Sequence, residues 1–172
     1  MAENFYSVTL EYLSEAHAEA IQRYAADERV AATSTEPHPY PLGAAQATIQ
    51  KAEEGRVSGT HYGFAINCGN TFAGACSLHW VNQHTQSADV AYWVAVPFWG
   101  QGLATEAVRQ LIAFCRLNLH LHRLKSGVLQ RNPASRRVLE KNQFHVFEEI
   151  VNTGQYADKF YGERFWQLQR LL

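Results

Sequence analysis

A segment near the middle of the chain limits the fold more than any other. Residues 90–99 form an apolar run that contains Pro97, and Gly100 and Gly102 follow directly. After these glycines, the apolar residues of 103–115 recur at helical spacing. The segment therefore predicts a buried strand, a glycine turn and an amphipathic helix in direct succession.

A turn of this kind favours an anion site at the start of the helix. Its glycines permit backbone angles or close approaches that a side chain would block, and the first amides of a helix have no acceptor within it. A phosphate group would accept hydrogen bonds from these amides. The same turn also joins strands to helices in proteins that bind nothing there, so by itself it leaves a purely structural role open.

Two better-known phosphate motifs fit the segment poorly. The turn lacks the Gly-Lys-Ser/Thr ending of a P-loop, and Thr105 stands where a dinucleotide-binding fingerprint carries its third glycine. The sequence therefore disfavours a nucleotidase or a hydride-transfer enzyme.

The remaining pattern predicts one domain over residues 1–172 with an α/β (α+β) fold. The second predicted helix is expected to end at Gly55, and three prolines between Pro37 and Pro41 predict a stiff loop before it. An antiparallel meander followed by alternating strands and helices predicts a mixed, mostly antiparallel sheet of six to seven strands flanked by about four helices. Strands are expected at about 5–12, 61–67, 71–80, 86–96, 123–129, 144–151 and 158–169, and helices at about 14–29, 44–54, 102–118 and 133–142.

Composition excludes several classes of partner. The chain has 15 Lys and Arg against 16 Asp and Glu, and the formal charge of -1 provides no broad field for nucleic acid or anionic lipid. The odd number of cysteines, Cys68, Cys76 and Cys115, and their apolar neighbours favour reduced, buried thiols.

The ends and the histidines suggest no membrane or metal function. A cytoplasmic location is expected, because the amino terminus has no basic region followed by an apolar stretch. The longest apolar run reaches only about half of the ~20 residues that a membrane span needs. His120 and His122 have no third ligand at a recognisable spacing, so no metal site is expected.

Two further segments lie before and after the glycine turn. Residues 88–94 read Ala-Asp-Val-Ala-Tyr-Trp-Val, and residues 132–135 read Asn-Pro-Ala-Ser at the start of a helical pattern that leads to Phe144. In order and spacing, the three segments resemble the GCN5-related N-acetyltransferase (GNAT) superfamily, specifically its ribosomal-protein N-terminal acetyltransferase (RimJ/RimL-type) branch. That branch has a strand ending in Tyr-Trp and an Asn-x-Ala-Ser helix. Pro39-Tyr40-Pro41 and Leu121-His122-Arg123-Leu124 are also similar, so the likeness spans most of the chain.

This resemblance implies an N-acetyltransferase that uses acetyl-coenzyme A (acetyl-CoA) as cosubstrate and no metal. The acetyl group would pass to a primary amine, either a protein N-terminus or a small amine, by direct attack in a ternary complex. The implied fold has a splay between the fourth and fifth strands, into which the pantetheine arm inserts, and the pyrophosphate sits on the amides of Gln101 to Ala104. The implied coenzyme-binding residues are Val94, Ala95, Val96, Trp99, Gly100, Gln101, Gly102, Leu103, Ala104, Thr105, Asn132 and Ser135.

The resemblance also implies two catalytic residues. Asp89 stands where the family often carries Glu, and we expect it to accept the proton of the attacking amine, directly or through water. Many members carry a Tyr donor where this chain has Leu139, so Ser135 is the candidate donor to the leaving thiolate. The residues leave two alternatives open: Asp89 as an exposed strand residue without a catalytic part, and Ser135 as a helix cap or as a residue that only faces the coenzyme.

The acceptor side is less defined. The resemblance places His38, Tyr40, His79, Trp80 and Tyr92 around the acceptor, although packing is the commoner role for each. Protein N-termini, polyamines, amino acids and antibiotics are not distinguished as acceptors. A catalytically inactive acyl-CoA-binding protein is the alternative function, because the Tyr is missing and the acid at Asp89 is shortened. A homodimer formed through sheet edges near the carboxyl terminus also stays open.

Overall fold

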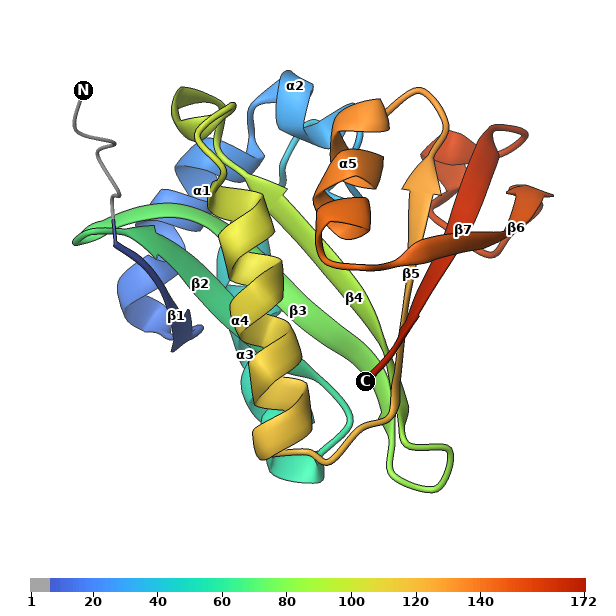
Figure 1. The fold of residues 1–172 in the computed structure, drawn as a ribbon. Helices are drawn as coiled ribbons and strands as arrows, with labels where there is room; N and C mark the ends of the chain where they lie inside the picture. The colour runs from blue at the N-terminus through green and yellow to red at the C-terminus, as the bar shows by residue number, and fades with distance from the viewer. Residues whose placement is uncertain (1–6) are drawn as a thin grey trace, which may run out of the picture.

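The computed structural model describes residues 7–172, which form a seven-stranded sheet covered by helices on both faces (Figure 1). The strands are β1 (Val8–Tyr12), β2 (Tyr62–Cys68), β3 (Thr71–Asn82), β4 (Ser87–Val94), β5 (Arg123–Leu129), β6 (His145–Val151) and β7 (Arg164–Leu171). The helices are α1 (Ala18–Ala25), α2 (Glu28–Ala31), α3 (Ala44–Ser58), α4 (Leu103–Leu117) and α5 (Pro133–Lys141), with short 3-10 helices η1 (Glu15–His17), η2 (Val96–Phe98) and η3 (Asp158–Phe160).

The strands lie in the order β1-β2-β3-β4-β5-β7-β6. Neighbouring strands are antiparallel except β4 and β5, which are parallel and are connected by α4. A parallel pair needs such a long crossover, whereas the antiparallel pairs β2–β3 and β3–β4 are joined by short turns. The predicted mixed, mostly antiparallel sheet is confirmed, and α2 brings the helices to five in the described residues.

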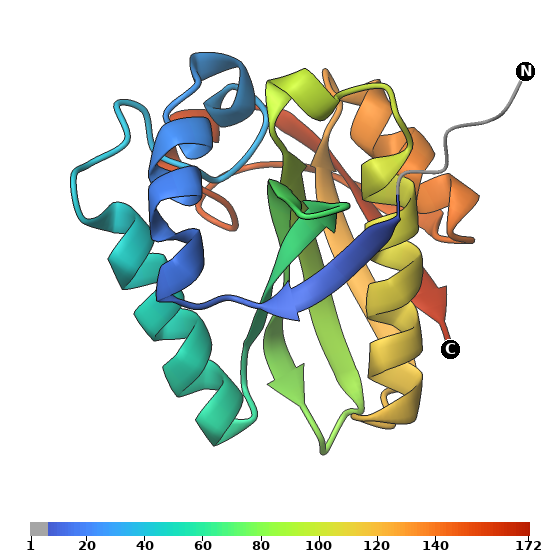
Figure 2. The ribbon, with the colours of Figure 1, turned by 90° about the vertical axis from the view of Figure 1, so that its left-hand side faces the viewer.

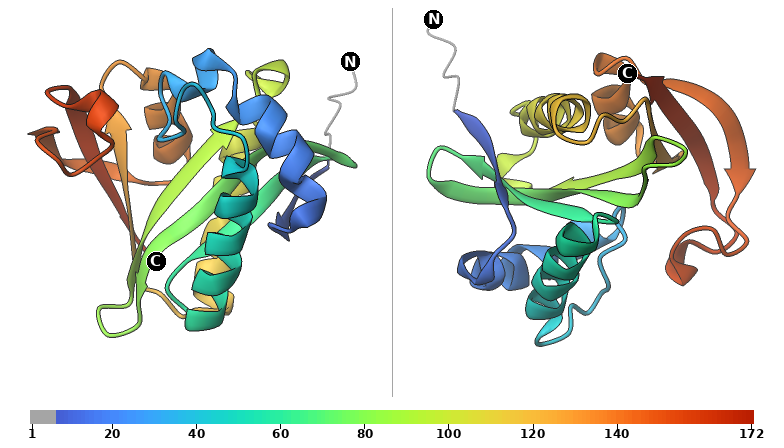
Figure 3. Two further views of the ribbon diagram at one scale, coloured as in Figure 1. Left: turned by 180° about the vertical axis from the view of Figure 1, so that it is seen from behind. Right: turned by 90° about the horizontal axis from the view of Figure 1, so that it is seen from below.

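Two apolar cores lie on opposite faces of the sheet. Helices α4 and α5 cover one face and α1 and α3 cover the other (Figure 3, right). The larger core packs α4 residues such as Leu111 against strand residues such as Ile66 and Leu124. The smaller core packs Ile21 of α1 and Ile49 of α3 against the opposite face. Figure 2 shows the helices of these two layers on either side of the central strands.

Three predicted boundaries are wrong, each because of a contact that is distant in the sequence or a local cap. Helix α3 does not end at Gly55 but continues to Ser58, and Gly59 caps it in the left-handed conformation with φ 74°. A side chain at Gly55 would collide with His61, since an added Cβ would lie 2.4 Å from the His61 Cβ. Gly55 therefore provides room for packing and does not stop the helix.

The predicted helix over 14–29 is divided, and the predicted strand over 158–169 begins later. Asp27 caps a separate α2 by accepting a hydrogen bond from the Arg29 amide at 2.9 Å, which ends the continuous helix at Ala25. Residues 158–160 form η3, and the last strand runs over Arg164–Leu171. The first predicted strand is confirmed from Val8 onward, while residues 5 and 6 lie outside the described part.

Candidate functional site

The parallel strands β4 and β5 pair at one end and separate toward the other (Figure 1). In the described residues their register covers three positions, the last of which is Asp89 opposite Lys125. Beyond it, the Ser126 hydroxyl donates to the Val90 carbonyl at 2.8 Å and marks the point where the strands diverge. This divergence is the expected splay. Beyond it, residues 91–94 of β4 and residues 127–129 of β5 form no backbone pairing with each other.

The glycine turn lies at the open end of this splay. Gly100 and Gly102 have φ of 74° and 79°, so both adopt the left-handed conformation. An added Cβ at either position would have no neighbour within 4 Å, which means that backbone angle, not crowding, requires glycine here. Helix α4 follows at once, with Gly102 as its N-cap.

The first turn of α4 presents amides that the helix itself does not use. Glu106 is the first residue whose amide donates back into the turn, to the Gly102 carbonyl at 3.1 Å, so the amides of Leu103, Ala104 and Thr105 have no acceptor four residues earlier in the helix. The buried Leu103 side chain anchors this start. The Glu106 carboxylate is paired with Arg109, which lowers the pKa of Glu106 and balances its charge. The geometry therefore fits an anion at this corner.

Trp99 connects the turn to the end of β4. Its indole Nε1 donates to the Val94 carbonyl at 2.7 Å, and about half of the residue is exposed. The Gln101 side chain similarly donates to the Pro97 carbonyl at 3.1 Å. These bonds hold the turn without using the amides at the start of α4.

Helix α5 approaches the splay from the side of α4. Asn132 caps it, because its Oδ1 accepts from the Ser135 amide at 3.3 Å. The Ser135 hydroxyl lies 2.8 Å from the Tyr92 hydroxyl, which donates its own proton to the Ser135 carbonyl at 3.0 Å. Either hydroxyl can be the donor in this pair. The cap role considered for Ser135 belongs to Asn132 instead.

Asp89 lies on the opposite face of the sheet from this pair. Its side chain is 34% exposed, and one carboxylate oxygen is 3.9 Å from the Lys125 ammonium. Partial burial raises the pKa of Asp89, and the charges of Lys125 and Arg123 oppose that rise. A carboxylate with a raised pKa binds a proton more readily, which suits a proton acceptor.

Two histidines lie together in this part of the sheet: His79, which the resemblance places on the acceptor side, and His61, which it does not name. His79 is the register partner of Asp89 on β3, and its Nε2 lies 2.7 Å from the Ser77 hydroxyl. The His61 ring packs against it with a centroid distance of 4.5 Å. Burial lowers the pKa of His79 to about 4, so its imidazole is neutral at pH 7. The resemblance names Asp89 and His79 separately, and only the strand register pairs them.

The other four predicted acceptor residues lie in different surroundings. Trp80 is 72% exposed and has a φ of 49°, which turns it outward next to His79. Tyr40 is buried in the core beneath α1 and α3, and His38 is exposed in the connection before α3. Tyr92 faces α5 and Ser135, on the other side of the sheet from Asp89. Trp80 therefore adjoins His79, the register partner of Asp89, whereas His38, Tyr40 and Tyr92 lie elsewhere.

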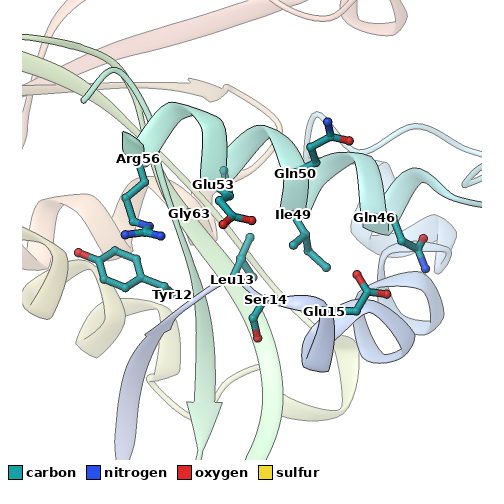
Figure 4. Close-up of a pocket in the computed structure, with 11 residues that line it drawn as sticks. Tyr12, Leu13, Ser14, Glu15, Gln46, Ile49, Gln50, Glu53, Arg56 and Gly63 are labelled. Atoms are coloured by element: carbon teal, nitrogen blue, oxygen red, sulfur yellow. The ribbon is translucent and has the colours of Figure 1, made fainter. Parts of the chain in front are cut away.

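A separate groove of about 470 Å³ lies between α3 and the segment that joins β1 to η1 (Figure 4). Ser14, Glu15, Gln46 and Glu53 line it, and Arg56 lies over the Tyr12 ring at one end. The groove is formed at the β1–β2 edge of the sheet, whereas the predicted site residues cluster at β4, α4 and α5.

Residues 7–172 show neither a membrane-spanning helix nor a metal-binding cluster. None of the helices there combines the length and apolar character needed to cross a membrane. The same residues include no group of three or more His, Cys, Asp or Glu side chains arranged to hold a metal ion.

A named relative matches part of the chain in sequence. The "Probable N-acetyltransferase YjcK" of Bacillus subtilis (strain 168) is 35% identical over 101 residues, which are 58% of this chain and 53% of that protein. The chain thus spans about half the length of the curated relatives that it matches first.

Solved structures share the whole arrangement at low sequence identity. RimJ of Mycobacterium smegmatis in complex with CoA-disulfide matches with a TM-score of 0.86 and 20% identity over 95% of this chain and 81% of that one. Spermidine N-acetyltransferase of Vibrio cholerae in complex with CoA and spermine matches with a TM-score of 0.81 and 16% identity over 95% of each chain. At these identities the likeness concerns the fold.

A family model settles the classification. The model described as the acetyltransferase (GNAT) domain matches residues 7–145, which include β1 to β5, the glycine turn, α4 and α5. The resemblance of the three segments is thereby confirmed. The chain belongs to the GNAT acetyltransferase family.

Proposed function

We propose that this chain is an acetyl-CoA-dependent N-acetyltransferase that acts on a primary amine. One observation carries the proposal: the splay between β4 and β5 opens beside amides at the start of α4 that the helix does not use. A phosphate would bind these amides, and an extended arm with its own amides would pair with the free strand edges.

The chain's residues fit coenzyme A without a basic surface patch. The amides of Gln101 to Ala104 donate toward a diphosphate, and the α4 dipole adds about 0.3 to 1 kcal/mol for each nearby negative charge. Charge-assisted hydrogen bonds contribute roughly 1.5 to 3 kcal/mol each. Asn132 has an amide nitrogen left for the pantetheine arm, because its oxygen caps α5.

Acetyl-CoA, when bound, supplies a thioester as the acetyl donor. Asp89 accepts a proton from the incoming ammonium, because an amine with a pKa near 10 is mostly protonated at neutral pH. The backbone near Val94 supplies an N–H to the carbonyl oxygen as negative charge develops on it. Ser135 provides a hydroxyl on the thiolate side, and the Tyr92 hydroxyl that it contacts holds it in place.

The acceptor in this proposal is a protein N-terminus or a small amine. Both kinds of acceptor occur in the names of proteins with this fold: RimL is a ribosomal L7/L12 alpha-N-protein acetyltransferase (TM-score 0.86), and the Vibrio cholerae protein is a spermidine N-acetyltransferase (TM-score 0.81). Trp80 lies at the surface next to His79, the register partner of Asp89, and is a candidate wall of the acceptor site. His38 and Tyr40 are proposed to shape this side from the segment before α3.

An acceptor screen with thiol detection tests the function. The chain is incubated with acetyl-CoA and a library of free-amino-terminal peptides, amino acids and polyamines, and release of CoA thiol is followed. We expect amine-dependent release with at least one acceptor class. Coenzyme binding without release across the library would instead indicate an inactive acyl-CoA-binding protein, and no coenzyme-dependent rise in melting temperature would refute both functions.

Substitutions at Gly102 test the phosphate turn. Gly102→Val forces a β-branched residue into the left-handed conformation and should weaken coenzyme binding at least tenfold. Gly102→Asn should bind nearly as well as the wild type, because Asn tolerates this conformation. Calorimetric titration with CoA measures both, and wild-type affinity in the Val variant would contradict the proposed turn.

A further inference from the structure

The connection between β6 and β7 brings an additional side chain, Tyr156, to the site. Its backbone is held by Asn152, which is fully buried. The Asn152 Oδ1 accepts from the amides of Gly154 and Tyr156 at 3.1 and 3.0 Å, and its Nδ2 donates to the Ala157 carbonyl at 3.3 Å. The chain on both sides of Tyr156 is therefore fixed by one buried amide.

The phenol of Tyr156 is positioned by three contacts. Its ring stacks on Phe165 of β7 with a centroid distance of 4.2 Å and an angle of 13°. Its oxygen accepts a hydrogen bond from the Gln167 Nε2 at 2.6 Å. Gly127 of β5 provides the space, because a Cβ there would lie only 1.9 Å from the phenolic oxygen. This close approach explains why β5 carries glycine at that position.

The phenol therefore lies over the splay, on the face of the sheet that carries Asp89. Gly127 follows Lys125 by two residues, so both point to the same face of β5. Lys125 is the last β5 residue in register with β4 and contacts Asp89 across that pairing. Tyr156 thus stands at the beginning of the open part of the splay, across from β4.

The hydroxyl of Tyr156 keeps a proton that it can donate. Burial raises the pKa of Tyr156, and the negative charges of Asp89 and Glu148 raise it further against the opposing bond from Gln167. The Gln167 bond uses a lone pair of the oxygen, not its proton. Among residues 7–172, no acceptor takes the Tyr156 proton. A partly buried donor of this kind is suited to a bound molecule.

We propose that Tyr156 is an acceptor-binding residue that donates a hydrogen bond to an oxygen atom beside the reactive amine. This inference rests on the proposed N-acetyltransferase function. The favoured acceptor carries a carbonyl next to its amine, as the N-terminal residue of a peptide does. A polyamine offers only nitrogen, which is mostly protonated at neutral pH, and the Lys125 ammonium near Asp89 repels such a chain of cations.

Two matched probes test this assignment. One is a tripeptide amide with a free amino terminus, and the other is its analogue in which the first carbonyl is reduced to methylene. Tyr156→Phe keeps the stacking on Phe165 and removes only the hydroxyl. We expect it to lower kcat/KM about tenfold for the tripeptide, mainly through the acceptor KM, and to change that of the reduced analogue less than about twofold. The KM for acetyl-CoA should stay at the wild-type value.

Two further variants separate the hydroxyl from the fold. Tyr161→Phe removes an exposed phenol from the same connection and should leave all constants unchanged. Gly127→Ala should displace the Tyr156 ring and raise the acceptor KM at least as much as Tyr156→Phe does. In a Tyr156→Ala background the same Gly127→Ala change should have little further effect, because the residue with which it collides is absent.

The outcomes distinguish this inference from the function on which it depends. Equal losses for both probes, or an unchanged acceptor KM in Tyr156→Phe, would overturn the assignment while the acetyltransferase function stands. Acetylation of spermidine, with no acetylation of either probe, would also overturn the assignment while the acetyltransferase function stands. If the wild-type protein acetylates no amine, the proposed function itself fails.

Discussion

Asp89 and His79 are register partners in the β3–β4 pair, and burial shifts their pKa values in opposite directions. Loss of water disfavours the charged form of each group, so the pKa of Asp89 rises and that of His79 falls to about 4. At pH 7 the site thus has one carboxylate that binds protons more readily than usual and one neutral imidazole. Both pKa shifts arise because this face of β3 and β4 is partly buried.

Replacement of Asp89 tests its role as the proton acceptor. Asp89→Asn keeps the shape and removes the basic oxygen, so we expect kcat to fall about 100-fold or more while the coenzyme-dependent rise in melting temperature is retained. Asp158→Asn, an exposed acid in η3, is the control and should be fully active. Wild-type turnover in Asp89→Asn would remove this residue from the mechanism.

The pH dependence should report the same carboxylate. In the proposed mechanism activity requires ionised Asp89, so it should fall as the pH drops through the raised pKa of this carboxyl group. Lys125→Met removes a charge that holds this pKa down and should move the acidic limb of kcat to higher pH. A limb that does not move, measured at saturating acceptor, would contradict this assignment.

His79 should make the fold sensitive to mild acid. Its pKa is lowered in the folded state, so the unfolded chain binds the proton more tightly, and stability falls as the pH decreases from about 6.5 toward 4. Between pH 7 and pH 5 this contribution is at most about 1 to 2 kcal/mol. His79→Gln should lose less stability over that interval than the wild type in denaturant titrations. His84→Gln, in the exposed β3–β4 turn, should behave like the wild type.

At the scale of single elements, local pattern predicted most of the site. The strand over Arg123–Leu129 and the helix that begins at Pro133 were predicted at those residues, because their apolar spacing and caps lie within the segments themselves. Gly55 was misread as a helix end because its requirement comes from His61, which only the folded chain brings against it.

Gln143 occupies a strained position that glycine should relieve. Its φ is 63°, and its amide and that of Phe144 close the last turn of α5 by donating to Glu140 and Leu139. A non-glycine residue in this conformation costs roughly 1 to 2 kcal/mol, partly offset in the variant by the greater freedom of unfolded glycine. Gln143→Gly should therefore stabilise the protein by about 0.5 to 1 kcal/mol in chemical denaturation. Arg137→Gly, inside the same helix, should destabilise it by about 1 kcal/mol.

At the scale of the whole molecule, one lysine joins distant segments around the acceptor face. The Lys159 ammonium in η3 donates to the Ala31 carbonyl at 2.6 Å and also to the Glu36 carbonyl. These bonds connect the β6–β7 connection that carries Tyr156 to the segment between α2 and α3. Figure 3 (left) shows the two segments on the same side of the sheet.

Loss of this link should loosen the acceptor side without affecting the coenzyme turn. Lys159→Met leaves both carbonyls without the ammonium, and we expect a loss of about 1 to 2 kcal/mol in stability. Hydrogen exchange should increase in residues 31–36 and 153–162 and stay unchanged at the start of α4. Lys51→Met on the exposed face of α3 is the control, and equal losses in the two variants would contradict the link.

The sequence by itself determined the glycine turn, the amphipathic α4, the capped α5 and the family to which these belong. Those features depend on backbone angles, helical spacing and unused amides within short segments. Only the tertiary structure decided that Tyr156 fills the space above Gly127, that Ser135 contacts Tyr92, and that Tyr92 and Asp89 face opposite sides of the sheet. These relations require strand register and loop packing, which arise from contacts between residues far apart in the chain and have no local sequence pattern.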